Sequence, residues 1–304
     1  ACVAGAIFLG AIIILHPFSS PRPDGRLHID FLDVGQGDSA LVTFPDGKTL
    51  LIDGGGRMEF RNDEGDGDDA FVPDQQGIGE SVVSPVLWNK GYSNIDYILA
   101  THADADHIQG LNDVAKNFSI GKALFGRMPA DDPEFQELVA VLKQRNIPYD
   151  YVSRGQQLKF GGATIEFLYP RSDISPDAPS DNNHSIVVRI IYGSRAVLLT
   201  GDIERVAESD LVNGGGTLHA DLIKVPHHGS RTSSTSEFIN AVGAKYAVIS
   251  VGRHSRFGHP HGEVVDRWSA SGAQVMTTGE QGMISVSTDG KDLLIKRFLD
   301  NDPK

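Results

Sequence analysis

Short apolar runs separated by turn-forming residues dominate the chain from residue 27 onward. Runs of roughly four to eight residues that are rich in β-branched and aromatic side chains, and bounded by Gly, Pro, Asn or Asp, are typical of strands. "LHIDFLDV", "SALVTF" and "KTLLID" are the first three, so residues 27–53 are predicted to form a strand meander. The same pattern predicts strands at 95–100, 122–126, 148–152, 156–160, 163–170, 184–193, 195–202, 221–226 and 246–252.

Apolar residues at helical spacing lie between these strands. Residues 79–92 repeat valine and leucine at intervals of three and four, and residues 132–146 are strongly amphipathic with Pro133 near their start. Helices are also predicted at 110–118, 204–213, 236–243 and 261–272, and the segments 274–290 and 292–299 are predicted to close as a hairpin. Two β-rich halves, each with helices, predict an α/β fold in which two packed sheets carry helices on both outer faces.

The first 26 residues follow a different pattern. Residues 3–15, "VAGAIFLGAIIIL", are uniformly apolar but too few to cross a bilayer, which needs roughly 20. The chain begins with Ala, so we interpret this run as the end of a truncated transmembrane helix, with a signal-peptide remnant and a buried helix as alternatives. The Pro-rich segment 16–26 is typical of a linker, and residues 27–304 are predicted to form the functional domain.

Composition and charge limit the function classes. Hydrophobic residues make up 40% of the 304 residues, which is ample for a large core, and the single Cys2 excludes an intramolecular disulfide or a cysteine zinc knuckle. The net charge of −13 argues against a broad electrostatic grip on nucleic acid, although bound cations could supply positive charge locally. Part of the acidic excess lies in 61–70, which lacks the ligand pattern of a calcium loop.

The segment "ILATHADADHIQGL" (98–111) places two histidines and two aspartates directly after an apolar strand. Two further predicted strands also end in Asp or His, at Asp202 and at His227 and His228. A lone Asp202 could equally be a helix cap, but three such strand ends are hard to explain by packing. Because strands that end together at one edge aim these groups at the same space, the sequence predicts a metal site.

"THADADH", "LLTGD" and "VPHHGS", in this order, resemble the motifs of the metallo-β-lactamase superfamily. "FLDVGQGDSALVTFPDGKTLLIDGGG", "DNNHSIVV" and "GHPHGEVVDRW" are similar to one branch, the C-terminal domain of ComEC-type DNA-internalisation (competence) proteins. The resemblance covers residues 27–298. It implies a four-layer αββα metallo-β-lactamase sandwich that holds two divalent metal ions at one rim.

The resemblance also implies a ligand set. His102 and Asp104 would face one metal, Asp106 and His107 would face the other, and Asp202 would bridge the two. His228, rather than His227, would be the last ligand. The superfamily usually has His where Asp104 stands, and the histidine expected before residues 185–191 is missing. Asp181, Asn182, Asn183 or His184 could stand in for it, and a turn is an equal alternative for Asn182 and Asn183.

The donor atoms favour one class of metal. Zinc prefers nitrogen and sulfur ligands, whereas carboxylate and amide oxygens favour harder ions. We therefore predict Mn²⁺, with Zn²⁺ as the second choice. The catalytic candidates are Asp106, His227, His259 and His261; the last two would contact phosphate or protonate the leaving oxygen, or simply form a turn that caps helix 262–270. Asp33 and Asp38 border the site or close a turn, and Asp38, Asn182 and Asn183 are candidate substrate contacts.

The resemblance implies a metal-dependent nuclease that degrades one DNA strand during import, through attack of a metal-bound hydroxide on phosphorus. Its partners would be single-stranded DNA, a membrane channel domain upstream in the same polypeptide and other competence proteins. Its place would be the bacterial inner membrane, on the extracytoplasmic side. The alternatives are a hydrolase for a small phosphodiester, ester or lactone, and a weakly catalytic docking module of the channel.

Overall fold

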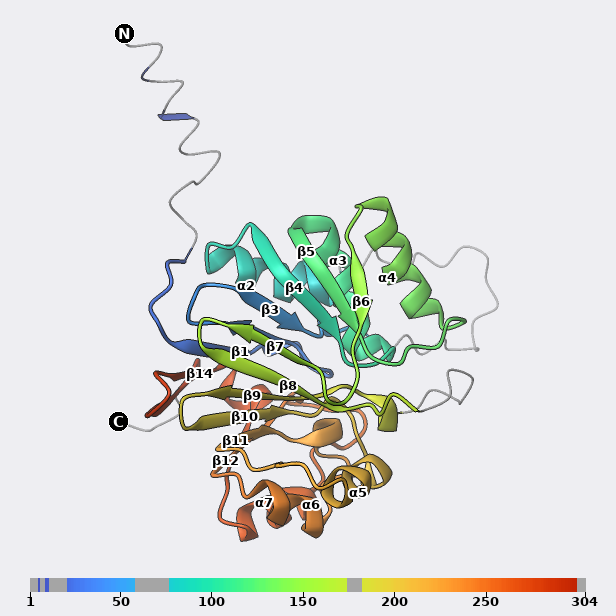
Figure 1. Cartoon of the computed structure of the whole chain (residues 1–304), viewed down its shortest axis with the longest axis vertical. Helices are drawn as coiled ribbons and strands as arrows, with labels where there is room; N and C mark the ends of the chain where they lie inside the picture. The colour runs from blue at the N-terminus through green and yellow to red at the C-terminus, as the bar shows by residue number, and fades with distance from the viewer. Residues whose placement is uncertain (1–4, 6–8, 11–20, 58–76, 174–181, 300–304) are drawn as a thin grey trace.

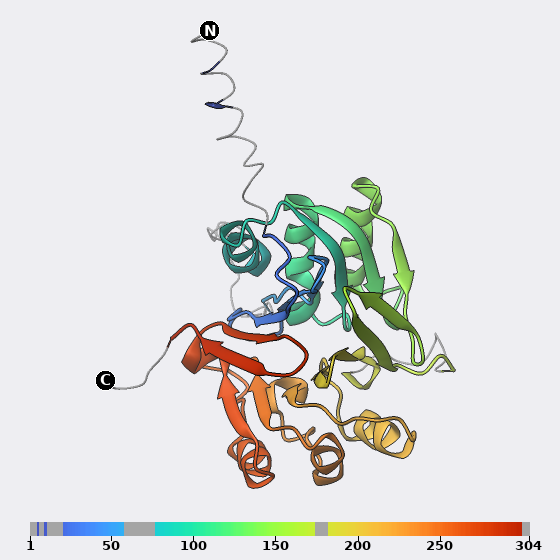
Figure 2. The same cartoon turned by 60° about the vertical axis from the view of Figure 1, so that its left-hand side comes forward.

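Two β-sheets lie face to face, and helices cover the outer face of each (Figures 1 and 2). The computed structural model describes residues 5, 9–10, 21–57, 77–173 and 182–299 of the chain. The predicted four-layer α/β sandwich is confirmed. Within the described residues no helix has the length and apolarity needed to span a bilayer. Most of the apolar run 3–15, and all of 61–70, lie outside the described residues.

The first sheet joins the N-terminal strands to a hairpin from the C-terminus. Its eight strands follow the order β15-β14-β1-β2-β3-β4-β5-β6. β3, β4, β5 and β6 run parallel, whereas β1 pairs antiparallel with both β2 and β14. The bounds are β1 Leu27–Phe31, β2 Ala40–Thr43, β3 Thr49–Ile52, β4 Asn94–Ala100, β5 Ser119–Phe125, β6 Tyr149–Tyr151, β14 Ile284–Thr288 and β15 Leu293–Arg297.

The second sheet has seven strands in the order β13-β12-β11-β10-β9-β8-β7. β10, β11, β12 and β13 run parallel, and β7, β8 and β9 complete the sheet as antiparallel neighbours. The bounds are β7 Gln157–Phe160, β8 Ala163–Tyr169, β9 Val187–Tyr192, β10 Arg195–Leu199, β11 Leu222–Lys224, β12 Tyr246–Ile249 and β13 Gln274–Thr277.

The helices bury one face each against the nearer sheet. α4 shows why: Asp132 caps it by accepting a hydrogen bond from the Phe135 N–H, Pro133 opens it, and its apolar stripe at helical spacing is buried. The first sheet carries η1 Gly79–Val83, α2 Ser84–Asn89, α3 Ala105–Asn117 and α4 Pro133–Gln144. The second carries α5 Arg205–Asn213, α6 Ser236–Val242 and α7 Gly262–Ala270, and short turns form η2 Asn182–His184, η3 Pro226–Gly229 and α8 Thr278–Gln281.

The core between the sheets comes from alternate strand residues. β8 alternates buried and half-buried positions along its whole length, so that Ile165 and Phe167 face inward. They pack with side chains of the opposite sheet such as Phe31 and Leu50. This contact fixes the two sheets relative to each other, and with them the two sets of strand ends that face the site.

Two predicted boundaries are wrong. The helix expected at 110–118 begins at Ala105, so the second half of "HADADH" is helical rather than a loop. The hairpin expected over 274–299 is divided: β13 joins the second sheet, and only β14 and β15 pair as a hairpin. In both cases the local pattern was compatible with either structure, and tertiary pairing decided between them.

Candidate metal centre

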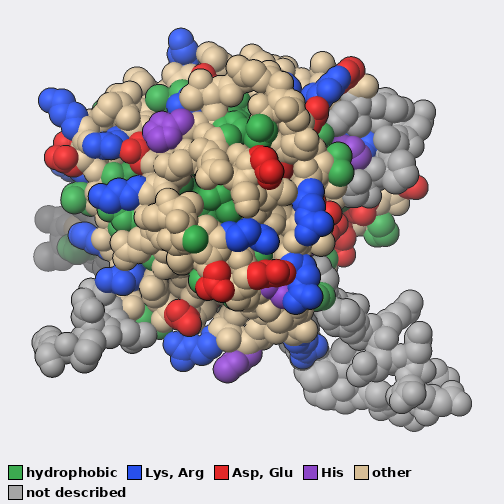
Figure 3. Space-filling model, turned by 90° about the horizontal axis from the view of Figure 1, so that it is seen from below, with side chains coloured by type: hydrophobic (Ala, Val, Ile, Leu, Met, Phe, Trp, Pro, Cys, Tyr) green, Lys and Arg blue, Asp and Glu red, His purple; other side chains and the backbone are tan. Residues whose placement is uncertain are grey.

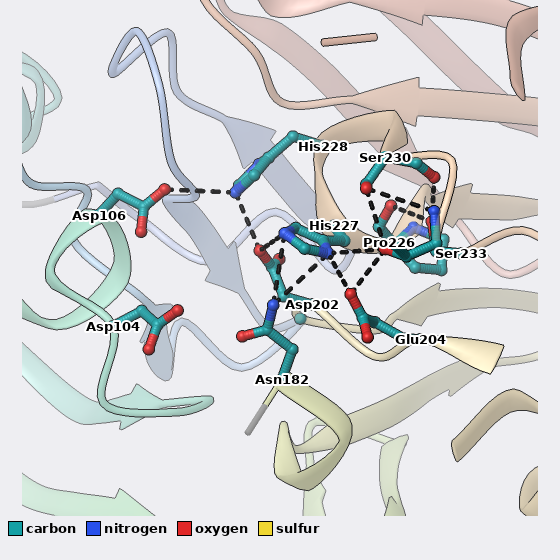
Figure 4. A network of polar contacts seen from close by, with 12 residues as sticks. Asp104, Asp106, Asn182, Asp202, Glu204, Pro226, His227, His228, Ser230 and Ser233 are labelled. Carbon is teal, nitrogen blue, oxygen red and sulfur yellow. Dashed lines mark hydrogen bonds and ion pairs between the residues drawn. The ribbon is translucent and has the colours of Figure 1, made fainter. Parts of the chain in front are cut away.

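Side chains from both sheets meet where the parallel strands end (Figure 4). β4 and the first turn of α3 bring one group, and the loops after β10 and β11 bring the other. Figure 4 shows Asp104 and Asp106 on one side of the gap and Asp202 and His228 on the other. The site therefore exists only while the two sheets hold together.

Four ligand atoms converge in the buried part of this gap. His107 Nε2 and His228 Nε2 lie 3.3 Å apart, and Asp202 Oδ2 lies 3.3 Å from the first and 3.0 Å from the second. Asp106 Oδ2 is 3.5 Å from His228 Nε2. All four side chains are buried. His107 Nε2, His228 Nε2 and Asp202 Oδ2 thus lie within 3.3 Å of one another with the Asp106 carboxylate beside His228, and these donors suit a divalent metal.

The far sides of both imidazoles are held by hydrogen-bond acceptors. His107 Nδ1 lies 2.9 Å from Asp53 Oδ2, and His228 Nδ1 lies 3.0 Å from the carbonyl oxygen of Ser250. Each acceptor places the ring proton on Nδ1, which leaves the Nε2 lone pair facing the gap. Metal-binding histidines in proteins are usually oriented in this way.

Asp38 belongs to the supporting layer. Its carboxylate approaches His228 through Nδ1, at 3.4 Å, and His107 through Nδ1, at 3.8 Å, so it lies behind the two rings. It also forms an ion pair with the buried ammonium of Lys224, which in turn lies 3.2 Å from Asp202 Oδ1. With Oδ1 held by Lys224, Asp202 presents Oδ2 to the gap.

His102 and Asp104 form a shallower half of the site. His102 Nδ1 is 2.9 Å from Thr101 Oγ1, while its buried Nε2 has no hydrogen-bond partner and points within 3.6 Å of Asp104 Oδ2. The Asp104 side chain is 51% exposed. A buried imidazole nitrogen without a partner is costly, and a cation between His102 and Asp104 would satisfy it. The residues present thus fit a second metal.

His227 lies beside the convergent atoms. Its Nδ1 is 3.1 Å from Glu204 Oε1, and its Nε2 is 3.3 Å from the Asn182 amide and 3.9 Å from Asp202 Oδ2. Figure 4 shows Asn182 and Glu204 on either side of this ring. His227 therefore reaches the rim of the site in a fixed orientation, whereas the buried His228 is the one in the cluster.

Three further predicted residues, Asn183, Asp33 and His184, make contacts within the structure that surrounds the site. Asn183 accepts hydrogen bonds from the N–H groups of Glu204 and Ala207, both at 3.1 Å, and so caps α5. Asp33 accepts a hydrogen bond from the Gly35 N–H at 3.3 Å, which closes the turn. His184 Nδ1 lies 2.8 Å from an Arg127 guanidinium nitrogen. These are the structural roles that the sequence left open.

His259 lies next to the rings of His227 and His228, and His261 lies next to His259. Their ring centroids lie 5.0 Å apart, and His259 is 5.7 Å from the His227 ring and 6.3 Å from the His228 ring. Neither side chain caps α7, although His261 occupies the N-cap backbone position. Burial, together with the neighbouring histidines, lowers the pKa of His259 to about 4, so this ring is neutral near pH 7.

The charged groups of the buried cluster strongly shift one another's pKa values. Burial alone would lower the pKa of His107, but Asp202 and Asp53 raise it well above the usual value. The pKa of His228 is likewise raised, against its burial, by Asp202 and Asp106. Burial would raise the pKa of Asp202, but His228, His107 and Lys224 hold it well below the usual range. Without a metal, the two histidines therefore hold protons that a bound metal would displace.

Three residues at the site have the left-handed backbone conformation, which residues other than glycine rarely adopt. Asp53, His227 and His228 have φ angles of 56°, 48° and 51°. Such left-handed residues concentrate at functional sites, where the surrounding structure holds them. Gly37, the second glycine of "GQGD", is needed because the two backbones lie close together. A Cβ at this position would lie 2.0 Å from the carbonyl oxygen of Asp106. The hairpin thus packs directly on the first turn of α3.

Sequence reasoning did not identify Asp53, Lys224 or Glu204. Asp53 follows β3 as Asp202 follows β10, so the same strand-end rule would have found it. Lys224 is a charged residue inside an apolar strand, which is itself a signal of a buried ion pair. Glu204 carried no such signal.

Comparison with known proteins agrees with this geometry. Residues 32–253 match the family model of the metallo-beta-lactamase superfamily. The chain is 30% identical over 285 residues to ComE operon protein 3 of Bacillus subtilis (strain 168), covering 93% of this chain and 35% of that protein. It is 30% identical over 279 residues to competence protein ComA of Neisseria gonorrhoeae, covering 90% and 35%. The chain thus spans about a third of the length of these curated relatives.

Among solved structures, the E377D mutant of CmlA β-hydroxylase gives a TM-score of 0.50 at 14% identity, covering 87% of this chain and 54% of that one. That likeness supports the fold. The family match covers more than half of the chain, and the two-sheet sandwich and the clustered Asp and His ligands agree with it. This chain belongs to the metallo-beta-lactamase superfamily.

Proposed function

We propose that this domain is a metal-dependent phosphodiesterase that cleaves one strand of DNA during its uptake. The observation that carries the proposal is the convergence of His107, His228, Asp106 and Asp202 on one point, with His102 and Asp104 beside them. The names of two relatives, a ComE operon protein and a competence protein, support DNA as the substrate.

The donor atoms support a pair of oxygen-preferring cations. Asp106, His107 and His228 would hold one metal, His102 and Asp104 the other, and Asp202 would be a ligand shared by both. Three carboxylates and three imidazoles favour Mn²⁺, with Zn²⁺ as the second choice. When bound, the two cations would polarise a phosphoryl group and activate water near neutral pH.

The protein's own side chains would position the substrate. His227, fixed by Glu204, and the Asn182 amide lie beside Asp202 and would contact a phosphate oxygen of the substrate. His259, neutral near pH 7, would donate or accept a hydrogen bond rather than supply a proton. We propose His261 as the group that protonates the leaving oxygen and His227 as a substrate contact. Asp38 and Lys224, both buried, would support the ligands rather than touch substrate.

We propose the cellular setting on the same grounds. The domain would act on single-stranded DNA beside a membrane channel domain of the same polypeptide and together with other competence proteins. It would face the extracytoplasmic side of the bacterial inner membrane, because a strand must be degraded before or during import.

One experiment separates this function from its alternatives. The protein is incubated with single-stranded DNA, double-stranded DNA and a chromogenic phosphodiester, each with Mn²⁺, Zn²⁺ or EDTA. We expect Mn²⁺-dependent cleavage of DNA that Asp106→Ala reduces by more than about 100-fold, because that variant removes a ligand. The matched control is Asp292→Ala, which removes an exposed carboxylate in the turn between β14 and β15.

Each alternative predicts a different result. Cleavage of the chromogenic ester but not of DNA would favour a small-substrate hydrolase. No metal-dependent cleavage of any substrate would favour a docking module. If only Zn²⁺ binds and supports turnover, the preference for Mn²⁺ is wrong. Equal cleavage by Asp106→Ala would assign the activity to a contaminant.

A further inference from the structure

The loop between β12 and α7, residues 252–261, is fixed at the rim of the metal centre. Ser255 Oγ lies 2.9 Å from Gln36 Oε1, which ties the loop to the hairpin that packs on α3. At its other end the His261 N–H donates to the carbonyl oxygen of Gly229, at 3.0 Å, directly after the last of the clustered histidines. Both ends of the loop are therefore held close to the metal ligands.

The loop concentrates positive charge in an acidic protein. Residues 252–262 contain two arginines, three histidines and no aspartate or glutamate, whereas the whole chain has a net charge of −13. By contrast, the face that carries α5, α6 and α7 shows basic and acidic side chains interspersed (Figure 3). A local excess of one charge beside a site attracts ligands of the opposite charge, so this rim favours an anionic ligand.

Two ring nitrogens of the loop are buried and lack a hydrogen-bond partner within the described part of the chain. They are His259 Nδ1 and His261 Nδ1. The His259 ring lies 5.7 Å from the ring of His227, which reaches the rim of the site. A buried polar atom without a partner costs free energy, which a ligand oxygen would recover. The loop thus leaves polar atoms unsatisfied next to the metal centre.

Arg256 is a cation of this loop that the described residues leave unpaired. Its exposed side chain forms no hydrogen bond or ion pair with any of them, and the same is true of the exposed side chain of His254. Arg253, by contrast, donates from Nε to a backbone carbonyl oxygen at 3.2 Å. Glu263, the first acidic residue after the loop, lies 3.6 Å from Arg231. The charge of Arg256 is therefore available to a ligand.

We infer that Arg256, with His254 beside it, binds a backbone phosphate next to the one that enters the metal centre. The inference rests on the proposed function and narrows its substrate class to a chain of several phosphodiesters, because a small ester has no second phosphate for this contact. Arginine suits the contact, since its guanidinium stays charged and forms paired hydrogen bonds with phosphate oxygens. Phosphate contacts carry no base information, so binding through this loop would not depend on the sequence of the strand.

The test measures how binding depends on salt. The whole chain, loaded with Mn²⁺, is titrated against a fluorescent oligothymidylate at low temperature and several KCl concentrations, and gel analysis verifies that the oligonucleotide stays intact. The logarithm of the association constant falls with the logarithm of the salt concentration, with a slope of about 0.7 for each phosphate contact to a single strand. We expect Arg256→Gln to reduce this slope by about 0.7 and to weaken binding about five-fold near 0.1 M salt.

Further variants and a second probe keep the test decisive. Arg256→Lys keeps the charge and should retain the wild-type slope, and an abasic oligomer of equal length should lose as much affinity in Arg256→Gln as the oligothymidylate. The matched control, Arg145→Gln, removes an exposed cation at the C-terminal end of α4 and should bind like wild type. A wild-type slope in Arg256→Gln, an equal loss in Arg145→Gln, or a loss confined to the oligothymidylate would each overturn the inference.

Binding needs no turnover, so the inference and the proposed function can fail separately. If Arg256→Gln reduces the salt slope but the wild-type protein cleaves no DNA, the phosphate contact stands and the proposed function is wrong. If the wild-type protein cleaves DNA and Arg256→Gln binds with an unchanged slope, the proposed function stands and the phosphate contact is wrong.

Discussion

Asp53 illustrates how a single residue that binds no metal can govern a metal site. Its carboxylate accepts hydrogen bonds from the Thr101 N–H and hydroxyl, both at 2.8 Å, and from His107 Nδ1 at 2.9 Å. It is 1% exposed, so solvent does not replace these contacts when they are lost. One buried carboxylate thereby sets both the backbone after β4 and the tautomer of His107.

We predict that Asp53→Asn lowers metal affinity by about 10- to 100-fold, the range seen when such supporting partners are removed. The amide preserves the volume, but it cannot satisfy all three donors, and its NH₂ group would oppose the His107 Nδ1–H. Calorimetric titration with Mn²⁺ measures the effect. Asp33→Asn is the matched control, because Asp33 is exposed and only closes a turn. Unchanged affinity in Asp53→Asn would mean that the helix alone orients His107.

At the level of residues, the sequence was informative where an apolar strand ended in Asp or His. His102, Asp202 and His228 were predicted in this way, and the structure brings them together. Lys224 was missed because its partners Asp38 and Asp202 lie far from it in the sequence. Local patterns reveal which groups point from a strand end, but only the tertiary pairing shows which of them face each other.

Among the elements, the contact between α5 and α6 depends on one buried carboxylate. Glu208, fully buried on α5, accepts hydrogen bonds from the backbone N–H groups of Ser234 and Thr235 at the start of α6. Burial raises the pKa of Glu208, which these N–H donors partly offset. Because Asp202 lies in the short loop between β10 and α5 and His228 lies in η3, between β11 and α6, this contact frames the second half of the site.

We predict that Glu208→Ala lowers the free energy of unfolding by about 2–3 kcal/mol, since it leaves two backbone donors without their charged acceptor. Urea denaturation followed by circular dichroism measures the change. Glu237→Ala, on the exposed face of α6, is the control and should stay within about 0.5 kcal/mol of wild type. A similar small change in Glu208→Ala would show that apolar packing alone docks the two helices.

Element boundaries were predicted less well than element types. "HADADH" carries Asp and His, which are compatible with a loop, yet α3 begins inside it at Ala105. The reason is tertiary: the Gly37 hairpin packs on this first turn, and the Gly54 N–H donates to the carbonyl oxygen of His107 at 2.7 Å. Likewise, β13 belongs to the second sheet because it pairs in parallel with β12, and no residue in the local sequence indicates this pairing.

In the molecule as a whole, the candidate metal centre takes its ligands from both sheets and so connects them. His107 and Asp106 come from the first sheet's helix α3, and Asp202 and His228 follow strands of the second. Any ligand that binds all four stabilises the folded state by an amount that grows with the logarithm of its affinity, because the unfolded chain offers no such cluster. Metal removal should therefore lower the melting temperature of the entire domain, not only of the rim.

The size of this stabilisation should depend on pH. The raised pKa values of His107 and His228 mean that the metal-free fold gains stability from their protonated forms at low pH and loses it as pH rises through these values. Metal binding must displace the same protons, so affinity should rise by about ten-fold per pH unit for each proton displaced. Both effects act in one direction, and we expect a larger difference in melting temperature between Mn²⁺ and EDTA at pH 8 than at pH 6. Differential scanning fluorimetry on wild type and Asp106→Ala measures this. A difference that is constant with pH would show that metal binding displaces no proton from the two histidines between pH 6 and pH 8.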